Sequence, residues 1–350
     1  MSAGFSVQTA PDPVEALNHF NEIATRYCES QMFFAACGLG IFEELASGPA
    51  TAGELAARLN IQPGPCRSLL MGLDGMGLVH CDGDLFSNSE MAAYVTSAAP
   101  VPLQALCVWG GLFYPIWGHL DDAVRENAPR WEQTFGATQQ ETFANVYKDP
   151  EALRRFCGLM SAYSIPQGKL LAETFDFLPY QCILDVAGGP GGMILEAGRR
   201  NPHLRGIVMD LPPVCEIAEE AIQEAGLAGR FTTQFADLFT GPYPAGADAI
   251  ALSWVLHDWN DDSCRRILRN CHAALPPGGA LLISESVLQP DGSGTPFALL
   301  MSLHMLALCE PGAKERTEAE YGALLEEAGF QVEKLVRLNA PRDLLIARRI

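Results

Sequence analysis

The sequence is short of basic side chains. Its 350 residues contain 23 Lys and Arg against 42 Asp and Glu, which gives a formal net charge of −19. The first hundred residues have only Arg26, Arg58 and Arg67 as bases, against eleven acids. Binding to nucleic acid or to an anionic membrane surface needs clustered Lys and Arg, so we expect neither partner.

Metal-ligand spacing and long apolar runs are also missing. The eleven cysteines form no CxxC pair and the seven histidines no HxxxH pair, so we predict no metal site. Scattered free thiols are typical of a reducing compartment, and no basic segment precedes an apolar run near the N-terminus. The longest apolar run, Phe297 to Cys309, is too short to cross a bilayer. We therefore expect a cytoplasmic protein.

What is present is an ordinary globular composition. Hydrophobic residues make up 48% of the chain and charged residues 19%, so a large core is expected. The length favours two domains, or one large domain with an appendage. We expect an N-terminal domain over residues 1–100, a helical connector that lines the substrate pocket over 101–178, and a catalytic domain over 179–350.

The first hundred residues predict mostly helix. The expected elements are an apolar helical pattern over 14–46, a helix from the capping box Thr51–Glu54 to Leu59, a helix over 66–76 after the breakers Pro63-Gly-Pro65, and a hairpin with Asp82-Gly83 as its turn. Helix, turn, helix and two-stranded wing is the order of a winged helix. The second helix carries one base, Arg67, so we favour dimerisation over DNA binding for this module.

The second half alternates strands with helices. Short β-rich runs are expected at 182–186, 206–209, 230–235, 248–253 and 279–285, with helices at 192–200, 213–226 and 261–275. Near-continuous apolar strands that alternate with helices predict a parallel sheet covered on both faces. A helix over 297–309, a capping box at Thr317–Glu320 with a helix to Ala328, and strands at 330–337 and 342–348 complete the pattern. The short connection between those last strands predicts an antiparallel hairpin at the sheet edge.

A glycine-rich segment, Asp185-Val-Ala-Gly-Gly-Pro-Gly-Gly192, follows the first of these strands. Glycines at a strand-to-helix turn let a ligand approach the backbone, which favours a nucleoside-cofactor crevice over a simple tight turn. A dinucleotide site needs GxGxxG, but Ala187 occupies the first glycine position and Pro190 has no N–H. No Lys follows the loop, which excludes a P-loop.

Aspartates stand at three successive strand ends. Asp210 could accept both ribose hydroxyls, and Asp237, among apolar residues, suits an adenine ring; either could also be an ordinary loop-initiating Asp. Together with Asp185 they predict an acidic crevice. Such a crevice favours a cationic ligand without phosphates. S-adenosylmethionine is such a ligand, because it carries a sulfonium and an ammonium group, whereas NAD carries phosphates.

His257 follows the fourth strand in the segment SWVLHDWNDD. An imidazole has a pKa near neutrality and suits a general base, which needs an acceptor on its other nitrogen. Glu285, at the end of the fifth strand, and Glu315, before the second capping box, are the candidate acceptors. The alternative is that Asp258 and its neighbours only cap the next helix and that His257 is incidental. We favour the base, because an apolar strand delivers His257 to the ligand edge.

Taken in order, the segments ILDVAGGPGG, VMDLP, ADLF, SWVLHDWND, LPPGGALLISES and GAKERTEAEYGALLEEAGF resemble the plant-type class I O-methyltransferases. This family includes caffeate, flavonoid and acetylserotonin enzymes and many bacterial enzymes of secondary metabolism. The resemblance covers nearly the whole chain, including QMFFAACGLGIFEELASGPATAGELAARL. It implies a Rossmann-like seven-stranded sheet, parallel with an antiparallel hairpin edge, after an all-α winged-helix dimerisation domain.

The resemblance also implies roles for individual residues. His257 would be the base, with Asp258, Glu285 and Glu315 around it. The implied S-adenosylmethionine contacts are Asp185, Gly188, Gly189, Asp210, Leu211, Asp237, Leu238, Ser253, Tyr163 and Ser164. The expected substrate-lining residues are Trp254, Phe113, Trp117, Met301, His304 and Met305. Members are usually intertwined homodimers, in which N-terminal helices of one subunit close the pocket of the other.

Three positions depart from the family pattern. Ala187 replaces the usual first glycine, Ser253 stands where plant members have Lys, and extra residues follow Glu310, so we prefer Glu315 as the orienting acid. The sequence thus predicts an O-methyltransferase acting on a small, aromatic hydroxyl compound. The alternatives are a C- or N-methyltransferase of the same fold and a winged-helix regulator that senses S-adenosylmethionine.

Overall fold

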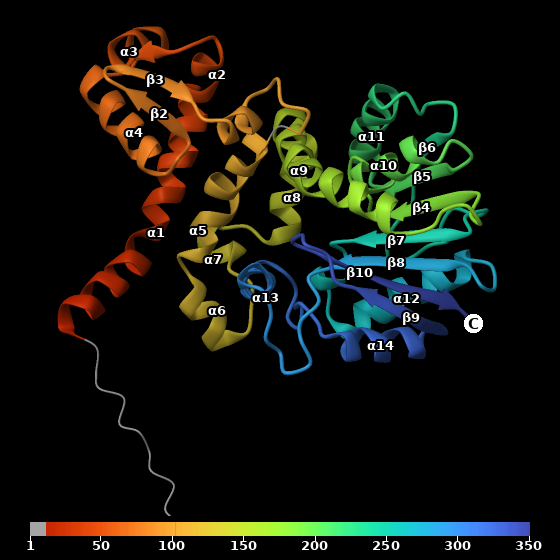
Figure 1. Ribbon diagram of the computed structural model, residues 1–350. Helices are drawn as coiled ribbons and strands as arrows, with labels where there is room; N and C mark the ends of the chain where they lie inside the picture. Colours follow the sequence, from red (N-terminus) through yellow and green to blue (C-terminus); the bar gives the residue numbers. More distant parts are fainter. Residues whose placement is uncertain (1–11, 102) are drawn as a thin grey trace, which may run out of the picture. The chain divides into compact units, whose positions relative to one another are not determined.

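Residues 12–101 and 103–350 are described by the computed structural model (Figure 1). The chain divides into two units, Met1–Gly110 and Gly111–Ile350. All eleven cysteines are free. Among the helices of the described residues, none has the length and apolar character needed to cross a membrane.

The N-terminal unit packs helices against a small antiparallel sheet. Its helices are α1 (Pro13–Leu39), α2 (Ile41–Ala46), α3 (Ala52–Leu59) and α4 (Pro63–Gly75), followed by the short 3₁₀ turns η1 (Met91–Val95) and η2 (Leu103–Cys107). Strand β3 (Leu85–Asn88) lies between β1 (Ala50–Thr51) and β2 (Val79–Asp82). The core contains Ile41, Phe42, Leu55, Leu70 and Phe86. The unit is thus mainly helical with the predicted hairpin, and the two-residue strand β1, which was not predicted, adds a third strand to that hairpin.

Two local predictions for this unit were wrong. Asp82 pairs with Leu85, so the hairpin loop is Gly83 and Asp84, rather than Asp82 and Gly83. Gly83, with a φ of 63°, supplies the left-handed backbone at the first loop position. Pro63 begins α4, rather than breaking the chain before it, because proline needs no hydrogen-bonded N–H in the first helical turn.

The second unit contains the expected seven-stranded sheet, in the order β6-β5-β4-β7-β8-β10-β9. The strands are β4 (Cys182–Val186), β5 (Arg205–Asp210), β6 (Phe231–Phe235), β7 (Ala249–Ser253), β8 (Ala280–Glu285), β9 (Phe330–Val336) and β10 (Asp343–Arg349). Strands β4 to β8 are parallel, and β10 is antiparallel to both β8 and β9. The predicted hairpin at the edge of the sheet is confirmed.

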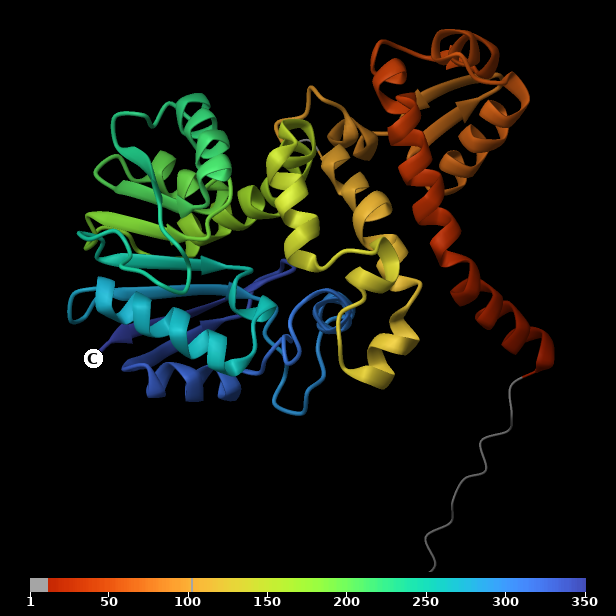
Figure 2. The same ribbon diagram turned by 180° about the vertical axis from the view of Figure 1, so that it is seen from behind.

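Alternate residues of the central strands enter two cores on opposite faces of this sheet, as pleated strands require. Leu184, Ile250 and Ile283 pack with α12 (Asp261–Ala274) and α14 (Glu318–Glu327) on the face that Figure 2 shows. Ile183, Ala251 and Leu282 pack on the other face, with α9 (Pro150–Thr174), α10 (Gly192–Arg200) and α11 (Pro212–Glu224). Burial on both faces explains why the central strands β4, β7 and β8 are apolar along nearly their whole length.

Helices also precede and interrupt the sheet. The remaining ones are α5 (Tyr114–Trp117), α6 (Leu120–Glu126), α7 (Trp131–Phe135), α8 (Gln139–Lys148) and α13 (Pro296–Leu308). The buried Trp131 donates from Nε1 to the Leu308 carbonyl at 2.6 Å, and the Arg130 amide donates to the Ala307 carbonyl at 2.8 Å. These bonds tie the start of α7 to the end of α13.

The reversal of β10 brings its amino end to the edge where the parallel strands finish. Asp343, its first residue, is paired with Glu285, the last residue of β8. In α/β sheets ligands bind outside the carboxyl ends of the parallel strands. Residues just before β10 therefore reach the same edge as residues just after β4, β5 and β7.

Candidate functional site

The glycine-rich loop after β4 turns sharply. Gly189 and Gly191 have φ values of 56° and 81°, and the Gly191 amide donates to the Gly188 carbonyl at 2.9 Å. A β-carbon on Gly188 would lie 2.6 Å from Asp185 Cγ, so this position accepts no side chain. Ala187 adopts the left-handed backbone with a φ of 53°. The loop thus keeps open backbone next to the Asp185 carboxyl group.

Asp185 lies on β4 and is 1% exposed. Neither of its carboxylate oxygens has a hydrogen-bond partner among the described residues. Burial, and then the nearby Asp210, raises the pKa of Asp185 to about 8. A buried carboxyl group without a partner has room for a donor or a cation brought by a ligand.

Asp210 ends β5 beside this loop. Its Oδ2 accepts from the Gly189 amide at 2.8 Å and its Oδ1 accepts from the Leu211 amide at 2.7 Å. Burial raises the pKa of Asp210, and the two amide bonds oppose that rise. A carboxylate has about four lone-pair sites, so this fixed side chain still has acceptor capacity for two hydroxyls.

Asp237, predicted to meet an adenine ring, stabilises its own loop after β6. Its Oδ1 accepts from the amides of Phe239 and Thr240 at 2.9 and 2.8 Å, and these bonds lower its pKa. The Leu238 carbonyl accepts from the Tyr243 hydroxyl at 2.7 Å. Both the functional and the loop-forming interpretations of Asp237 are compatible with this geometry.

Helix α9 passes the glycine loop at its middle. A β-carbon on Gly192 would lie 2.4 Å from Ser164 Oγ, so the absence of a side chain lets α9 approach the start of α10. Ser164 Oγ is buried and makes no hydrogen bond to another described residue. The ring of Tyr163 lies 4.6 Å from that of Trp254, centroid to centroid.

His257 lies in a short 3₁₀ turn, Leu256–Asp258, after β7 and is 3% exposed. Its Nδ1 is 2.7 Å from Glu315 Oε1 and 3.6 Å from Glu285 Oε2. Glu285 Oε1 is already held by the Val255 and Leu256 amides at 3.0 and 2.9 Å. Of the two candidate acids, Glu315 therefore makes the hydrogen bond to the imidazole, and Glu285 fixes the backbone that carries it.

The carboxylates change the titration of this cluster. Burial lowers the pKa of His257, but Glu285, Glu315 and Asp258 outweigh it and raise that pKa to about 10. For Glu285, burial has the opposite sign: it raises the pKa of the carboxyl group to about 7, although the nearby His257 lowers it. An imidazole whose Nδ1–H donates to Glu315 has Nε2 as its proton-accepting atom.

Asp258 is the third acid near the ring, with Oδ1 3.5 Å from His257 Nε2. Its Oδ1 also lies 3.5 Å from the thiol of Cys309. Glu310 does not join this group, because its Oε1 accepts from the Asn260 amide at 2.7 Å. Glu310 instead anchors the start of α12.

Two buried arginines close to these residues were not predicted as site residues. Arg316 donates to the carbonyls of Leu256 and Trp259 at 2.9 and 2.7 Å, and so clamps the turn that holds His257. Arg342 donates to Ser253 Oγ and to the Tyr163 carbonyl, both at 2.7 Å. The only sequence signal for Arg316 was its place in the KERT segment, and Arg342 had none.

Aromatic side chains gather on His257 and on helix α13. Trp254 stacks on the His257 ring with centroids 5.8 Å apart and an interplanar angle of 20°. On α13, Met301, His304 and Met305 are all buried. Trp117 Nε1 donates to His304 Nδ1 at 3.0 Å, and Phe113 packs edge-on to His304 at 4.8 Å. The structure thus brings together five of the six residues expected to line the substrate site around His304 and α13.

His304 is a neutral imidazole in this environment. Burial, and then the charge on His257, lowers the pKa of His304 to about 3. Because Nδ1 accepts the Trp117 hydrogen bond, the ring proton lies on Nε2. This histidine therefore presents a donor rather than a base.

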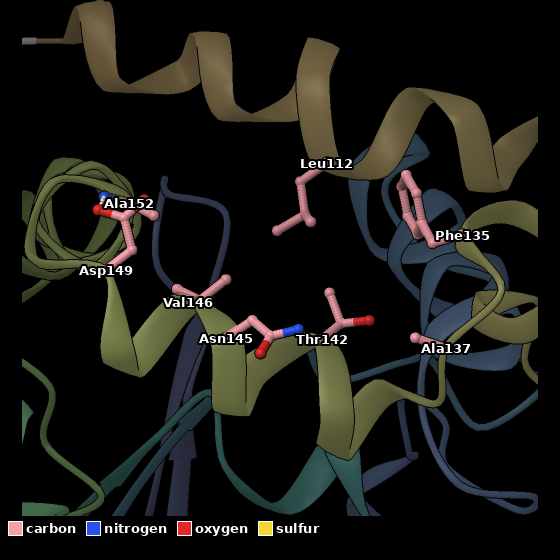
Figure 3. Close-up of a pocket in the computed structure, with 8 residues that line it drawn as sticks. All are labelled: Leu112, Phe135, Ala137, Thr142, Asn145, Val146, Asp149 and Ala152. Carbon is pink, nitrogen blue, oxygen red and sulfur yellow. Dashed lines mark hydrogen bonds between the residues drawn. The ribbon is translucent and has the colours of Figure 1, made fainter.

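A separate groove of about 390 Å³ lies in the same unit (Figure 3). Its lining is largely apolar and consists of Leu112, Phe135, Ala137, Thr142, Asn145, Val146, Asp149 and Ala152. None of these residues belongs to the glycine loop or to the acids around His257. The groove is therefore not the candidate cofactor crevice.

His257, Glu285 and Glu315 also have the geometry of a metal-ligand set, with one ligand atom each within 4.8 Å of the others. Their chemistry favours a hydrogen-bonded triad instead. Nδ1 of His257 is the ring atom nearest both glutamates, and its proton is held by Glu315 at 2.7 Å. A metal ion at this point would have to displace that proton.

Comparison with known proteins gives two family matches. Residues 117–331 match the model of the O-methyltransferase domain, and residues 21–98 match that of the O-methyltransferase dimerisation domain. The first match alone spans more than half of the chain.

Individual relatives are similar over nearly the whole length. A 3-hydroxy-5-methyl-1-naphthoate 3-O-methyltransferase of Streptomyces sahachiroi is 35% identical, over 97% of each chain. An N,N-dimethyltransferase of Streptomyces rimosus is 32% identical, over 93% of this chain and 94% of its own. The crystal structure of human N-acetylserotonin methyltransferase in complex with S-adenosylmethionine superposes with a TM-score of 0.88 at 30% identity, covering 98% of this chain and 99% of the human one.

Proposed function

The chain belongs to the O-methyltransferase family, and on that premise we propose that it methylates a hydroxyl group of a small aromatic molecule with His257 as general base. It is an S-adenosylmethionine-dependent methyltransferase. The observation that carries the assignment of the base is the 2.7 Å hydrogen bond between His257 Nδ1 and Glu315, which directs Nε2 to accept the proton.

The crevice after β4 fits S-adenosylmethionine. Asp185 offers a buried carboxyl group without a partner for the positively charged methionine end, beside the open backbone of Gly188 and Gly189. Asp210 and Leu211 would hold the ribose, and Asp237 and Leu238 the adenine. When bound, the cofactor supplies an electrophilic methyl group on a sulfonium.

The remaining chemistry belongs to side chains of this protein. Nε2 of His257 would take the hydroxyl proton of the acceptor, and Glu315 would stabilise the resulting imidazolium through Nδ1. Glu285 and Arg316 hold the turn that carries the ring. The protein thus mainly positions the acceptor and removes one proton.

Replacement of His257 tests the base. We expect His257→Ala to lower kcat about 10²- to 10⁴-fold on a phenol, indole or polyketide that the protein methylates, and to leave the affinity for S-adenosylhomocysteine unchanged by calorimetry. His80→Ala, which alters an exposed histidine of the N-terminal unit, is the control and should leave both unchanged. Near-normal turnover of a folded His257→Ala protein would refute the assignment.

Methylation of nitrogen is the second candidate function, because a relative from S. rimosus is an N,N-dimethyltransferase. An amine attacks through a lone pair and depends less on a base. Mass spectrometry and NMR of the products from paired hydroxyl and amine acceptors separate the two functions. An N-methylated product whose rate is insensitive to His257→Ala would favour this candidate, and a C-methylated product would favour the third option of the same fold.

We further propose that the protein is a homodimer. Residues 21–98 match the dimerisation domain of the family. Helix α1 exposes an apolar stripe formed by Val14, Leu17, Phe20, Ile23 and Tyr27, each at least half exposed. Such a stripe at helical spacing favours burial against another surface, and we assign that surface to a second copy of the chain.

A further inference from the structure

Arg342 reaches the candidate site from the opposite direction to the other site residues. It directly precedes β10, whose amino end lies at the carboxyl edge of the parallel strands. Its side chain is 3% exposed, although it carries a full charge. A buried guanidinium is retained only where hydrogen bonds and opposite charges compensate its loss of water.

The guanidinium joins two elements that border the crevice. Nη1 donates to Ser253 Oγ at the end of β7, and Nη2 donates to the Tyr163 carbonyl in α9, both at 2.7 Å. Its Cζ also lies 4.6 Å from the centre of the Trp254 ring. One side chain thus fixes the strand end, the helix and the tryptophan that stacks on His257.

The backbone at Pro341 and Arg342 is held by two side-chain hydrogen bonds. Gln167 Nε2 donates to the Arg342 carbonyl at 3.3 Å, and Ser286 Oγ donates to the Pro341 carbonyl at 2.9 Å. Gln167 and Ser286 are each 2% exposed. Arg342 is therefore held in place before any ligand arrives.

The charge has acidic neighbours on both sides. Burial lowers the pKa of Arg342 to about 10, while Glu285, Glu315 and Asp185 oppose that fall. Arg342 in turn lowers the pKa of Asp185, against the effect of burial. The cation thus compensates the acids of the His257 cluster and of the glycine loop together.

We propose that Arg342 is a positioning residue for methyl transfer, which holds the ends of β7 and α9 in the arrangement that receives the methyl donor. This inference rests on the proposed use of the crevice for S-adenosylmethionine. It predicts that the fork of hydrogen bonds, and not only the charge, is required, because Lys cannot bond Ser253 and the Tyr163 carbonyl with the geometry of a planar guanidinium.

Calorimetry with S-adenosylhomocysteine tests the inference without any acceptor. We expect Arg342→Met to weaken its binding about tenfold or more, and Arg342→Lys to recover only part of that loss. In turnover the KM for the donor should rise by a similar factor, whereas the KM for the acceptor should change little. A purely structural role would lower the melting temperature and leave the affinity of the folded protein unchanged.

Ser253→Ala provides a double-mutant cycle. If the Ser253–Arg342 bond acts in donor binding, the effects of Ser253→Ala and Arg342→Met are not additive. Arg348→Met is the matched control, since Arg348 lies on β10, the strand that Arg342 precedes, and forms a partly exposed ion pair with Glu333 at 2.6 Å. The Arg348→Met protein should bind S-adenosylhomocysteine as tightly as the unaltered protein.

The outcomes separate this inference from the proposed function. If the unaltered protein does not bind S-adenosylhomocysteine, the proposed function fails. If it binds and the folded Arg342 variants bind equally well, or if the cycle is additive, the inference alone is wrong. If Arg342→Met does not fold, Arg342→Lys and Ser253→Ala still decide, because unchanged affinity in both overturns the inference.

Discussion

Ala187 and Trp254 both have left-handed backbone close to proposed site residues, Asp185 and His257, with φ values of 53° and 55°. A β-carbon in this conformation costs about 1–2 kcal/mol. Such strain persists where the surroundings fix the backbone, and it concentrates at functional sites. The strained backbone at Ala187 lies in the glycine-rich loop beside Asp185. The strained backbone at Trp254 lies where the chain leaves β7 and turns toward His257.

Ala187→Gly should relieve this strain. We expect the free energy of unfolding to rise by about 0.5–1 kcal/mol, because the relief exceeds the extra entropy of glycine in the unfolded chain. Urea denaturation measures the change. Ala221→Gly, in the last turn of α11, is the contrasting control and should lower stability by up to about 1 kcal/mol. Equal losses in both variants would contradict the strain at residue 187.

Glu285→Gln should move the pH profile of the reaction. The acids raise the pKa of His257 to about 10, so the imidazole is mostly protonated near neutral pH and kcat/KM should rise with pH as that proton leaves. Removing one negative charge lowers the pKa of His257, so the rising limb should shift to lower pH. Glutamine keeps an oxygen for the Val255 and Leu256 amides. A profile that does not move would show that Glu285 has no electrostatic effect on the base.

At the scale of elements, the N-terminal cap of α14 stabilises the fold and also adjoins the residues that contact the His257 turn. Its capping box joins Thr317 and Glu320, with the Thr317 amide donating to the carboxylate at 2.8 Å. Glu315 and Arg316 directly precede this cap, so fraying of α14 would loosen both contacts to the His257 turn.

Thr317→Ala should therefore lower both stability and rate. We expect a loss of about 1 kcal/mol in the free energy of unfolding, the usual value of a helix cap, together with a lower kcat. Thr138→Ala removes the equivalent cap of α8 and should cost similar stability without changing kcat. Equal kcat values in the Thr317→Ala and Thr138→Ala proteins would show that the α14 cap has no effect on the site.

The elements of the seven-stranded sheet were largely predictable, because its central strands β4, β7 and β8 are apolar runs that alternate with helices. The ends of those strands also placed Asp185, Asp210 and His257 at one edge. Local rules were weaker for the N-terminal unit, where β1 has two residues and is defined by pairing alone. A strand that short has no periodicity to detect.

The contacts that complete the site could not be predicted from local pattern. Arg316 meets Leu256 across 60 residues, and Arg342 meets Ser253 across 89 and Tyr163 across 179. Nothing in the local sequence distinguishes an arginine that will be buried from one that will lie on the surface. Only the strand order, with β10 inserted between β8 and β9, shows that Arg342 lies at the ligand edge.

At the scale of the whole molecule, the exposed stripe on α1 tests the proposed homodimer. Phe20→Glu places a charge at a position that is 67% exposed in the single chain, so its effect on folding of one copy should be small. We expect analytical ultracentrifugation to show a dimer for the unaltered protein and monomer for Phe20→Glu. Glu22→Gln, a change at an exposed acid of the same helix, should leave the dimer intact. A dimer of unchanged strength in Phe20→Glu would remove the stripe from the interface.

The antiparallel direction of β10 couples hairpin length to chemistry. One residue inserted between Arg342 and Asp343 would move the guanidinium by about 3.3 Å and turn it to the other face of the sheet. The hydrogen bonds to Ser253 and Tyr163, at 2.7 Å each, tolerate no such displacement. Insertions and deletions in this hairpin are thus constrained by the proposed site, even though surface loops between neighbouring strands are ordinarily free to vary in length.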